Sequence, residues 1–119
     1  MAYSFEEVLQ ELIRDTGAEG AVLVSPDGLA IASVLPENID EDRVAAMGAA
    51  ILSLGERVAS ELEKGELEQL YVKGSEGYVI FTGIKDFAVL GVLAPSNIKL
   101  GLLLMEIKKV IKKLEQQMG

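Results

Sequence analysis

The sequence contains no cysteine, no histidine and no tryptophan. Without cysteine no disulfide can form, which excludes a secreted scaffold held together by disulfides. The missing cysteine and histidine also exclude thiolate nucleophiles, zinc sites built from these residues, and mechanisms that use a histidine base. We therefore expect neither a cofactor nor a metal site in this chain.

Positive charge is scarce as well. The chain has 11 lysines and arginines against 19 aspartates and glutamates, a net charge of -8 at pH 7. Nucleic acid binding requires a basic face, so we expect no nucleic acid partner, and anionic membranes are unfavoured too. Five cations nevertheless gather late in the chain: Lys99, Lys108, Lys109, Lys112 and Lys113. Lys108, Lys109, Lys112 and Lys113 complement the dipole of a C-terminal helix, or alternatively form a docking surface for an acidic partner or lipid headgroup.

Long apolar runs and targeting signals are also missing. No N-terminal segment combines a basic start, an apolar stretch and a small-residue cleavage site, so we expect no signal peptide. The apolar run Leu100 to Met105 is far shorter than the ~20 residues that cross a bilayer. We expect a cytoplasmic protein without membrane insertion, forming a single domain over residues 1–119. Half of the chain is apolar, which is high for this size and favours coverage by another chain.

The N-terminal residues predict a helix. Ser4 and Glu7 have the spacing of a capping box, and Tyr3 and Val8 that of a hydrophobic staple. Apolar residues then recur at helical spacing until Gly17, which ends the helix.

The remaining elements are five strands and two helices. The strands are expected at residues 21–24, 29–32, 67–73, 78–81 and 87–93. The helices are expected at about residues 40–63 and 98–116, the last one capped by Ser96 and Asn97. Ser25-Pro26-Asp27-Gly28 fits a type I turn, and turns are also expected at 74–77 and 83–86. Short hairpin loops force antiparallel pairing. The fold class is therefore α+β, with one mostly antiparallel five-stranded sheet in the order α-β-β-α-β-β-β-α.

The middle helix has too few polar residues for the surface of a monomer. With Val44 toward the sheet, the same face carries Gly48, Ile51, Gly55, Val58 and Leu62, with Met47 and Leu54 beside it. The outward positions would then be Ala45, Ala46, Ala49, Ala50, Leu52 and Ser53. A helix that is apolar all round is normally buried all round, so we infer a second helix against it, most simply from a second copy. Alanine serving only as a good helix former is the alternative.

The usual chemical motifs are missing. Neither a P-loop nor a Gly-x-Gly-x-x-Gly fingerprint occurs, and Gly74, Gly77 and Gly83 are interpreted as turn residues. The carboxylates fall on predicted exposed helix faces, and no serine has a histidine partner. We therefore predict that the chain is not an enzyme and has no catalytic residues.

Several stretches in a fixed order resemble the Roadblock family of dynein light-chain-like domains, and within it the MglB-like proteins of bacteria and archaea. They are Gly20–Val24, Pro26–Ser33, Asp42–Met47, Gly65–Gln69 and Leu100–Met105. The resemblance implies a Roadblock/profilin-like sheet with the long middle helix on one face and the terminal helices on the other. It also implies a dimer in which the middle helices lie side by side and the third strands pair.

Members of this family act as non-catalytic partners of Ras-like GTPases, as subunits of signalling scaffolds, or as dynein light chains. In MglB-like proteins the dimer stimulates the GTPase by ordering the GTPase's own catalytic groups. The resulting hypothesis is a homodimeric adaptor or regulator that binds a Ras-like small GTPase of the MglA type. A structural scaffold subunit and a small-molecule sensor are the alternatives. The expected dimer and partner interface comprises Ala45, Ala46, Ala49, Ala50, Leu52, Ser53, Glu56, Arg57, Leu67, Gln69, Leu70, Tyr71 and Val72.

Overall fold

The structure is a computed structural model that describes residues 4–119. Its elements are α1 (Phe5–Thr16), β1 (Gly20–Val24), β2 (Ala30–Val34), α2 (Glu41–Glu61), β3 (Leu70–Gly74), β4 (Gly77–Ile84), β5 (Ala88–Pro95) and α3 (Leu100–Met118). This is the predicted order, and the α+β class is confirmed. Tyr3, half of the predicted staple, lies outside the described residues.

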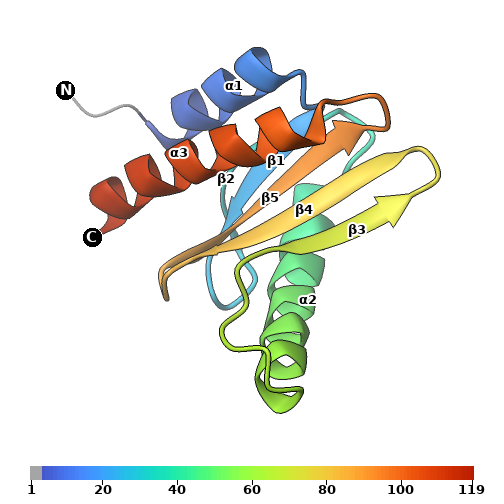
Figure 1. The fold of residues 1–119 in the computed structure, drawn as a ribbon. Helices are drawn as coiled ribbons and strands as arrows, with labels where there is room; N and C mark the ends of the chain where they lie inside the picture. The colour runs from blue at the N-terminus through green and yellow to red at the C-terminus, as the bar shows by residue number, and fades with distance from the viewer. Residues whose placement is uncertain (1–3) are drawn as a thin grey trace.

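One five-stranded sheet forms the centre of the molecule, with strand order β2-β1-β5-β4-β3. Every neighbouring pair is antiparallel, so β2 and β3 are the two edge strands. The helices α1 and α3 lie together on one face of the sheet and α2 crosses the other (Figure 1). The predicted arrangement of the helices is therefore confirmed.

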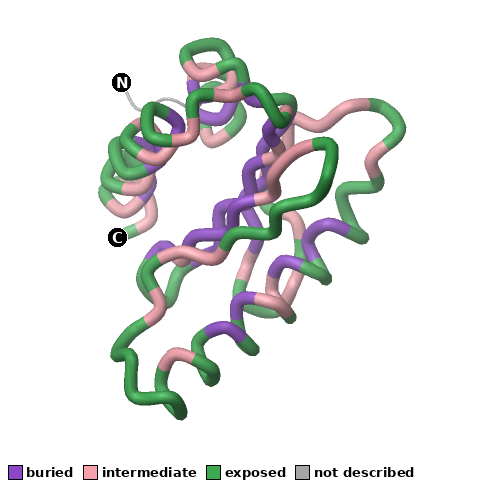
Figure 2. The backbone as a smooth tube through the Cα atoms, turned by 45° about the vertical axis from the view of Figure 1, so that its right-hand side comes forward, coloured by how far each residue is buried: buried purple, intermediate pink, exposed green. Residues whose placement is uncertain are grey.

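The sheet has a hydrophobic cluster on each face, because alternate residues of a strand point to opposite sides. Leu23, Ile80 and Leu90 belong to the cluster under α1 and α3. Val22 and Phe81 belong to the smaller cluster under α2. The C-terminal half of α2 extends past the strands and is largely exposed (Figures 1 and 2).

Signals that lie within a few residues of each other are found where the sequence predicts them. The backbone N–H of Glu7 donates to Ser4 Oγ at 3.2 Å, and that of Ser4 donates to Glu7 Oε1 at 3.1 Å, which completes the capping box. Gly17 caps the helix end at φ 81°. In the β1–β2 turn, the N–H of Gly28 donates to the carbonyl of Ser25 at 2.9 Å, and Gly28 has φ 87°.

The segment after α2 differs from the prediction. The strand β3 begins at Leu70, so Leu67 and Gln69 precede it. The chain reverses through left-handed Glu63 (φ 58°) and Gly65 (φ 87°), and Leu67 then packs on α2 instead of pairing in the sheet. A Cβ added at Gly55 would lie 3.1 Å from Leu67 Cδ2, so the leucine packs closely over this glycine.

Two further local predictions were wrong. Gly83 lies inside β4 opposite Val89 and is not part of a turn. The N-cap of α3 is Lys99, which makes no side-chain capping bond, and not Ser96 or Asn97.

Candidate partner interface

The helix α2 is rotated relative to the prediction. Its buried residues are Val44, Ala45, Gly48, Leu52 and Gly55. Ala45 is 0% exposed and Leu52 5% exposed, so placing these two on the outward face was wrong. The rotation is explained by the place where α2 comes closest to the sheet, because a Cβ at Gly48 would lie 2.9 Å from Cε1 of Phe81. Only a glycine lets the helix lie this close to the ring.

The rotation leaves large apolar residues outside. Met47 is 55% exposed and Leu54 59%, and Val58 and Leu62 are exposed as well. All four were predicted to lie toward or beside the sheet, which their exposure contradicts. Met47, Leu54 and Val58 form an apolar stripe along one side of α2, of a kind that soluble monomers rarely expose, and Leu62 lies past the last residue of the helix, outside this stripe.

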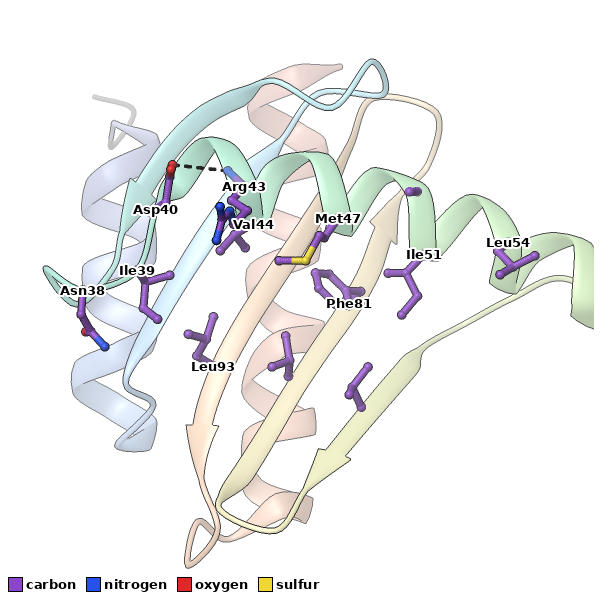
Figure 3. Close-up of a pocket in the computed structure, with 13 residues that line it drawn as sticks. Asn38, Ile39, Asp40, Arg43, Val44, Met47, Ile51, Leu54, Phe81 and Leu93 are labelled. Carbon is purple, nitrogen blue, oxygen red and sulfur yellow. Dashed lines mark hydrogen bonds between the residues drawn. The ribbon is translucent and has the colours of Figure 1, made fainter.

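An open groove of about 760 Å³ lies between this stripe and the sheet (Figure 3). From α2, Met47 and Ile51 extend toward the side on which Phe81 and Leu93 lie. The other apolar residues that line it are Ile39, Val44, Ala50, Leu54, Val72 and Val79. Polar groups lie at one end only, where Asn38, Asp40 and Arg43 are found. Asp40 also caps α2, since its Oδ1 accepts from the backbone N–H of Asp42 at 2.9 Å.

The edge strand β3 borders the groove. Val72 is 41% exposed and lines the groove, and within residues 4–119 no strand pairs with the outer edge of β3. Tyr71 lies opposite Ile80 and therefore points to the other face, where its hydroxyl donates to Gln69 Oε1 at 2.7 Å. An edge with unpaired backbone groups is a template for another strand.

The outermost side of α2 carries small and charged residues, which we call the outer ridge: Ala46, Ala49, Ser53, Glu56 and Arg57. Ala49 is only half-exposed, because the β1–β2 turn packs on it, and a Cβ at Gly28 would lie 3.6 Å from Ala49 Cβ. The close packing of this turn is therefore one reason why α2 carries small side chains at this position. Arg57 is exposed and forms an ion pair with Glu61 at 3.5 Å.

A smaller cleft of about 270 Å³ flanks the outer ridge. Ala49, Ser53 and Glu56 line it from α2, and Lys85 and Asp86 from the β4–β5 turn. The charged residues Glu56, Lys85 and Asp86 are among those that line this cleft, whereas the charged residues of the groove, Asp40 and Arg43, lie at one end of it. The two surfaces of α2 therefore differ in chemistry, one apolar and one polar.

The structure thus separates the predicted interface residues into sets. Ala50 and Val72 line the groove, with Leu70 half-buried next to them at the start of β3. Ala46, Ala49, Ser53, Glu56 and Arg57 form the outer ridge, and Gln69 and Tyr71 lie at the β3 edge on the opposite face. Ala45, Leu52 and Leu67 are packed within the chain itself.

Met47, Ile51, Leu54, Val79 and Phe81 line the groove but were not among the predicted interface residues. The spacing of Met47, Leu54 and Val58 along the helix is the signal that could have found the stripe. Among residues 4–119, no group of three or more acidic, histidine or cysteine side chains is placed to hold a metal ion. Within the same range, no helix combines the length and apolar character needed to traverse a bilayer.

These features define a class: a three-layer α+β protein whose single helix on one face stands beside an open groove and an open sheet edge. Within that class, the chain belongs to the Roadblock/LC7 domain family, whose sequence model matches residues 4–94. The resemblance seen in the sequence is thereby confirmed.

Relatives match the chain over most of its length. Uncharacterized protein MJ0714 of Methanocaldococcus jannaschii is 36% identical over 110 residues, which is 92% of either chain. Among solved structures, a Roadblock/LC7 domain from Streptomyces avermitilis superposes with a TM-score of 0.89 at 20% identity, covering 97% of this chain and 98% of that one. Myxococcus xanthus MglB gives a TM-score of 0.87 at 24% identity, covering 98% and 92%. At these identities the two structures show a shared fold.

Proposed function

We propose that this chain forms a homodimer through its groove and β3, and that the dimer is a non-catalytic adaptor that binds a Ras-like small GTPase and stimulates its GTP hydrolysis. Membership of the Roadblock/LC7 family and the likeness to MglB support a regulator of small GTPases. The observation that carries the proposal is the apolar groove that runs along the unpaired edge of β3.

A two-fold dimer would cover both features together. If β3 pairs with β3 of a second copy, the two helices α2 come to lie side by side on the same face of a continuous sheet. The interface is then isologous, and the stripe of each copy covers the groove of the other. Met47 and Leu54 are about half-exposed in one copy. Their full burial would contribute about 1 kcal/mol each, twice over by symmetry.

The dimer is tested with Ala50→Glu. Ala50 is exposed in the single chain and lines the groove, so a glutamate there leaves the isolated fold intact but buries a carboxylate in the dimer. We expect light scattering at micromolar concentration to give twice the chain mass for the native protein and the single-chain mass for the variant. A native monomer, or a variant that remains dimeric, would contradict the proposed interface.

Ser53→Glu is the matched control and the test of the second surface. It adds the same charge one turn along the same helix, at an exposed position that lines the cleft and not the groove. We expect this variant to remain dimeric but no longer to bind the GTPase. Ala49 is a poorer choice, because it packs against the turn at Gly28 and a charge there would disturb the fold.

GTPase binding is measured with each small Ras-like GTPase encoded in the same genome, beginning with any encoded beside this gene. Each is purified and loaded with a non-hydrolysable GTP analogue for calorimetry, and with GTP for hydrolysis rates. We expect one of them to bind the native dimer and to hydrolyse GTP faster, and both effects to disappear with Ser53→Glu. Binding without faster hydrolysis would make the dimer a tether and not an activator.

The groove itself favours a second candidate, a small-molecule sensor. Its volume of about 760 Å³ lies within the usual range of ligand sites, about 300–1,000 Å³. Its polar groups, including Asp40 and Arg43, lie at one end, where they would orient a ligand. Native mass spectrometry separates the candidates, since a metabolite bound to a monomer supports the sensor. A tighter complex with a different Roadblock-type chain would instead support a scaffold subunit.

A further inference from the structure

The outer side of α3 carries a surface that the proposed function does not use. We call it the α3 ridge, and it comprises Leu102, Met105, Lys108, Lys109 and Lys112. Met105 is 58% exposed and Leu102 is exposed too, so the ridge is apolar near the start of the helix and basic near its end. Cations near a helix C-terminus complement the dipole. That effect does not account for the two exposed apolar side chains.

The lysines of the ridge are only partly neutralised within the chain. Lys109 lies 3.2 Å from Glu106, and the neighbouring Lys113 lies 4.0 Å from Glu11. Lys108 and Lys112 have no carboxylate within 4.0 Å among the described residues. Residues 99–119 hold five of the chain's 11 cations but only two of its 19 carboxylates. The ridge is therefore a basic surface on an acidic protein.

A surface of opposite character lies at the far end of α2. We call it the acidic tip, and it comprises Glu61, Leu62, Glu63, Glu66 and Glu68. It projects beyond the sheet (Figure 1), and Leu62 is 66% exposed. Glu61 pairs with Arg57, whereas Glu63, Glu66 and Glu68 have no cation within 4.0 Å among the described residues. Lys64 is the one cation in this stretch of sequence.

We propose that the α3 ridge binds the acidic tip of a second copy of this chain. Leu62 would lie against Leu102 and Met105, and the tip glutamates against Lys108 and Lys112. The contact joins two different surfaces, so it is heterologous and links proposed dimers into larger assemblies. It uses neither the groove nor β3, and therefore does not depend on the proposed dimer interface.

The neighbourhood of the ridge favours a narrow occupant over a flat one. The helix α1 lies beside α3 (Figure 1) and exposes Glu6, Glu7 and Asp15. An anionic membrane that covered both helices would meet these carboxylates, of which Asp15 is paired with Arg14 at 4.0 Å, and Glu6 and Glu7 would repel it. A projecting tip reaches the lysines alone. Exposed ion pairs are individually weak and screened by salt, so we expect a weak, salt-sensitive contact.

Charge reversal tests the contact by sedimentation velocity on the full chain, over concentrations of about 10 µM to about 1 mM. For the native chain we expect the weight-average sedimentation coefficient to rise with concentration at about 0.15 M salt and to stay flat at about 0.5 M. The ridge variant Lys108→Glu/Lys112→Glu and the tip variant Glu63→Lys/Glu66→Lys should each lose this rise. An equimolar mixture of the two variants should regain it, because each supplies the complement that the other lacks.

The control is Arg14→Glu, which lies outside both surfaces and changes the net charge by the same amount as the single ridge variant Lys108→Glu. The control should associate like the native chain, whereas Lys108→Glu should associate less. All variants should keep the dimer mass at low concentration, so a failure here is distinct from a failure of the groove dimer. A native chain that does not associate, a ridge variant that still does, or a mixture that stays inactive would overturn the proposal. Binding of the native chain to phosphatidylglycerol vesicles without self-association would assign the ridge to a lipid surface instead.

Discussion

At the scale of single residues, we expect the same substitution, threonine to valine, to change the free energy of unfolding in opposite directions at Thr82 and Thr16. Thr82 is buried in β4, and its hydroxyl oxygen has no hydrogen-bond partner in the part of the chain that the structure describes. Replacing it by valine keeps the shape and removes the unsatisfied hydroxyl. We expect Thr82→Val to raise the free energy of unfolding by about 1 kcal/mol, measured by urea denaturation.

The matched control is Thr16→Val at the end of α1. Thr16 Oγ1 donates to the carbonyl of Leu12 at 2.7 Å and accepts from the N–H of Ala18 at 3.2 Å. Losing both bonds should lower the free energy of unfolding by about 1 kcal/mol. If Thr82→Val lowered the free energy of unfolding as Thr16→Val does, the hydroxyl of Thr82 would have a partner.

Residue-scale signals were predictable where partners lie close in sequence. The capping box of Ser4 and Glu7 and the turn at Gly28 need only three or four residues, and both are present. The start of α3 was predicted wrongly because the local signal there is misleading. Ser96 and Asn97 look like caps locally, but the chain continues past Pro95 and begins its helix after Lys99.

At the scale of elements, the type and order of helices and strands followed from the hydrophobic pattern, but the rotation of α2 did not. The helix is apolar on nearly every side, so periodicity alone fits several phases equally well. The phase depends on where α2 meets the sheet, at Gly48 over Phe81 and at Gly55 under Leu67. These contacts join residues far apart in the sequence, and no local pattern contains them.

The fit of α2 onto the sheet can be tested with two identical substitutions. Gly48→Ala places a methyl group 2.9 Å from the Phe81 ring, which must shift within a packed cluster. The gain of about 1 kcal/mol in helix propensity should be outweighed by overpacking of about 1–3 kcal/mol. We expect a lower thermal midpoint for this variant.

Gly101→Ala is the control in α3. A methyl group there has no heavy atom within 4 Å outside its own helix, so only the propensity gain remains. We expect the free energy of unfolding to rise by about 0.5–1 kcal/mol. Stabilisation by both variants would mean that α2 does not lie as close to Phe81 as described.

At the scale of the whole molecule, the sequence indicated that another chain covers α2, and the structure changes which residues would be covered. Alanines were expected to carry the interface, whereas the exposed stripe consists of larger side chains such as Met47 and Leu54. The groove could not be predicted, because its floor comes from β4 and β5 and its wall from α2. With Val72 of β3, residues from four elements become one surface only after the sheet has formed.

Dimerisation should also make the thermal midpoint depend on protein concentration. If the native state is a dimer and the unfolded state a monomer, mass action stabilises the native state as concentration rises. For two chains of this length we expect the thermal midpoint to rise by about 3 °C per tenfold increase in concentration. Ala50→Glu should abolish this dependence, and Ser53→Glu should retain it. Calorimetry over two decades of concentration measures the slope, and a native midpoint that does not move with concentration would contradict a dimer closed over the groove.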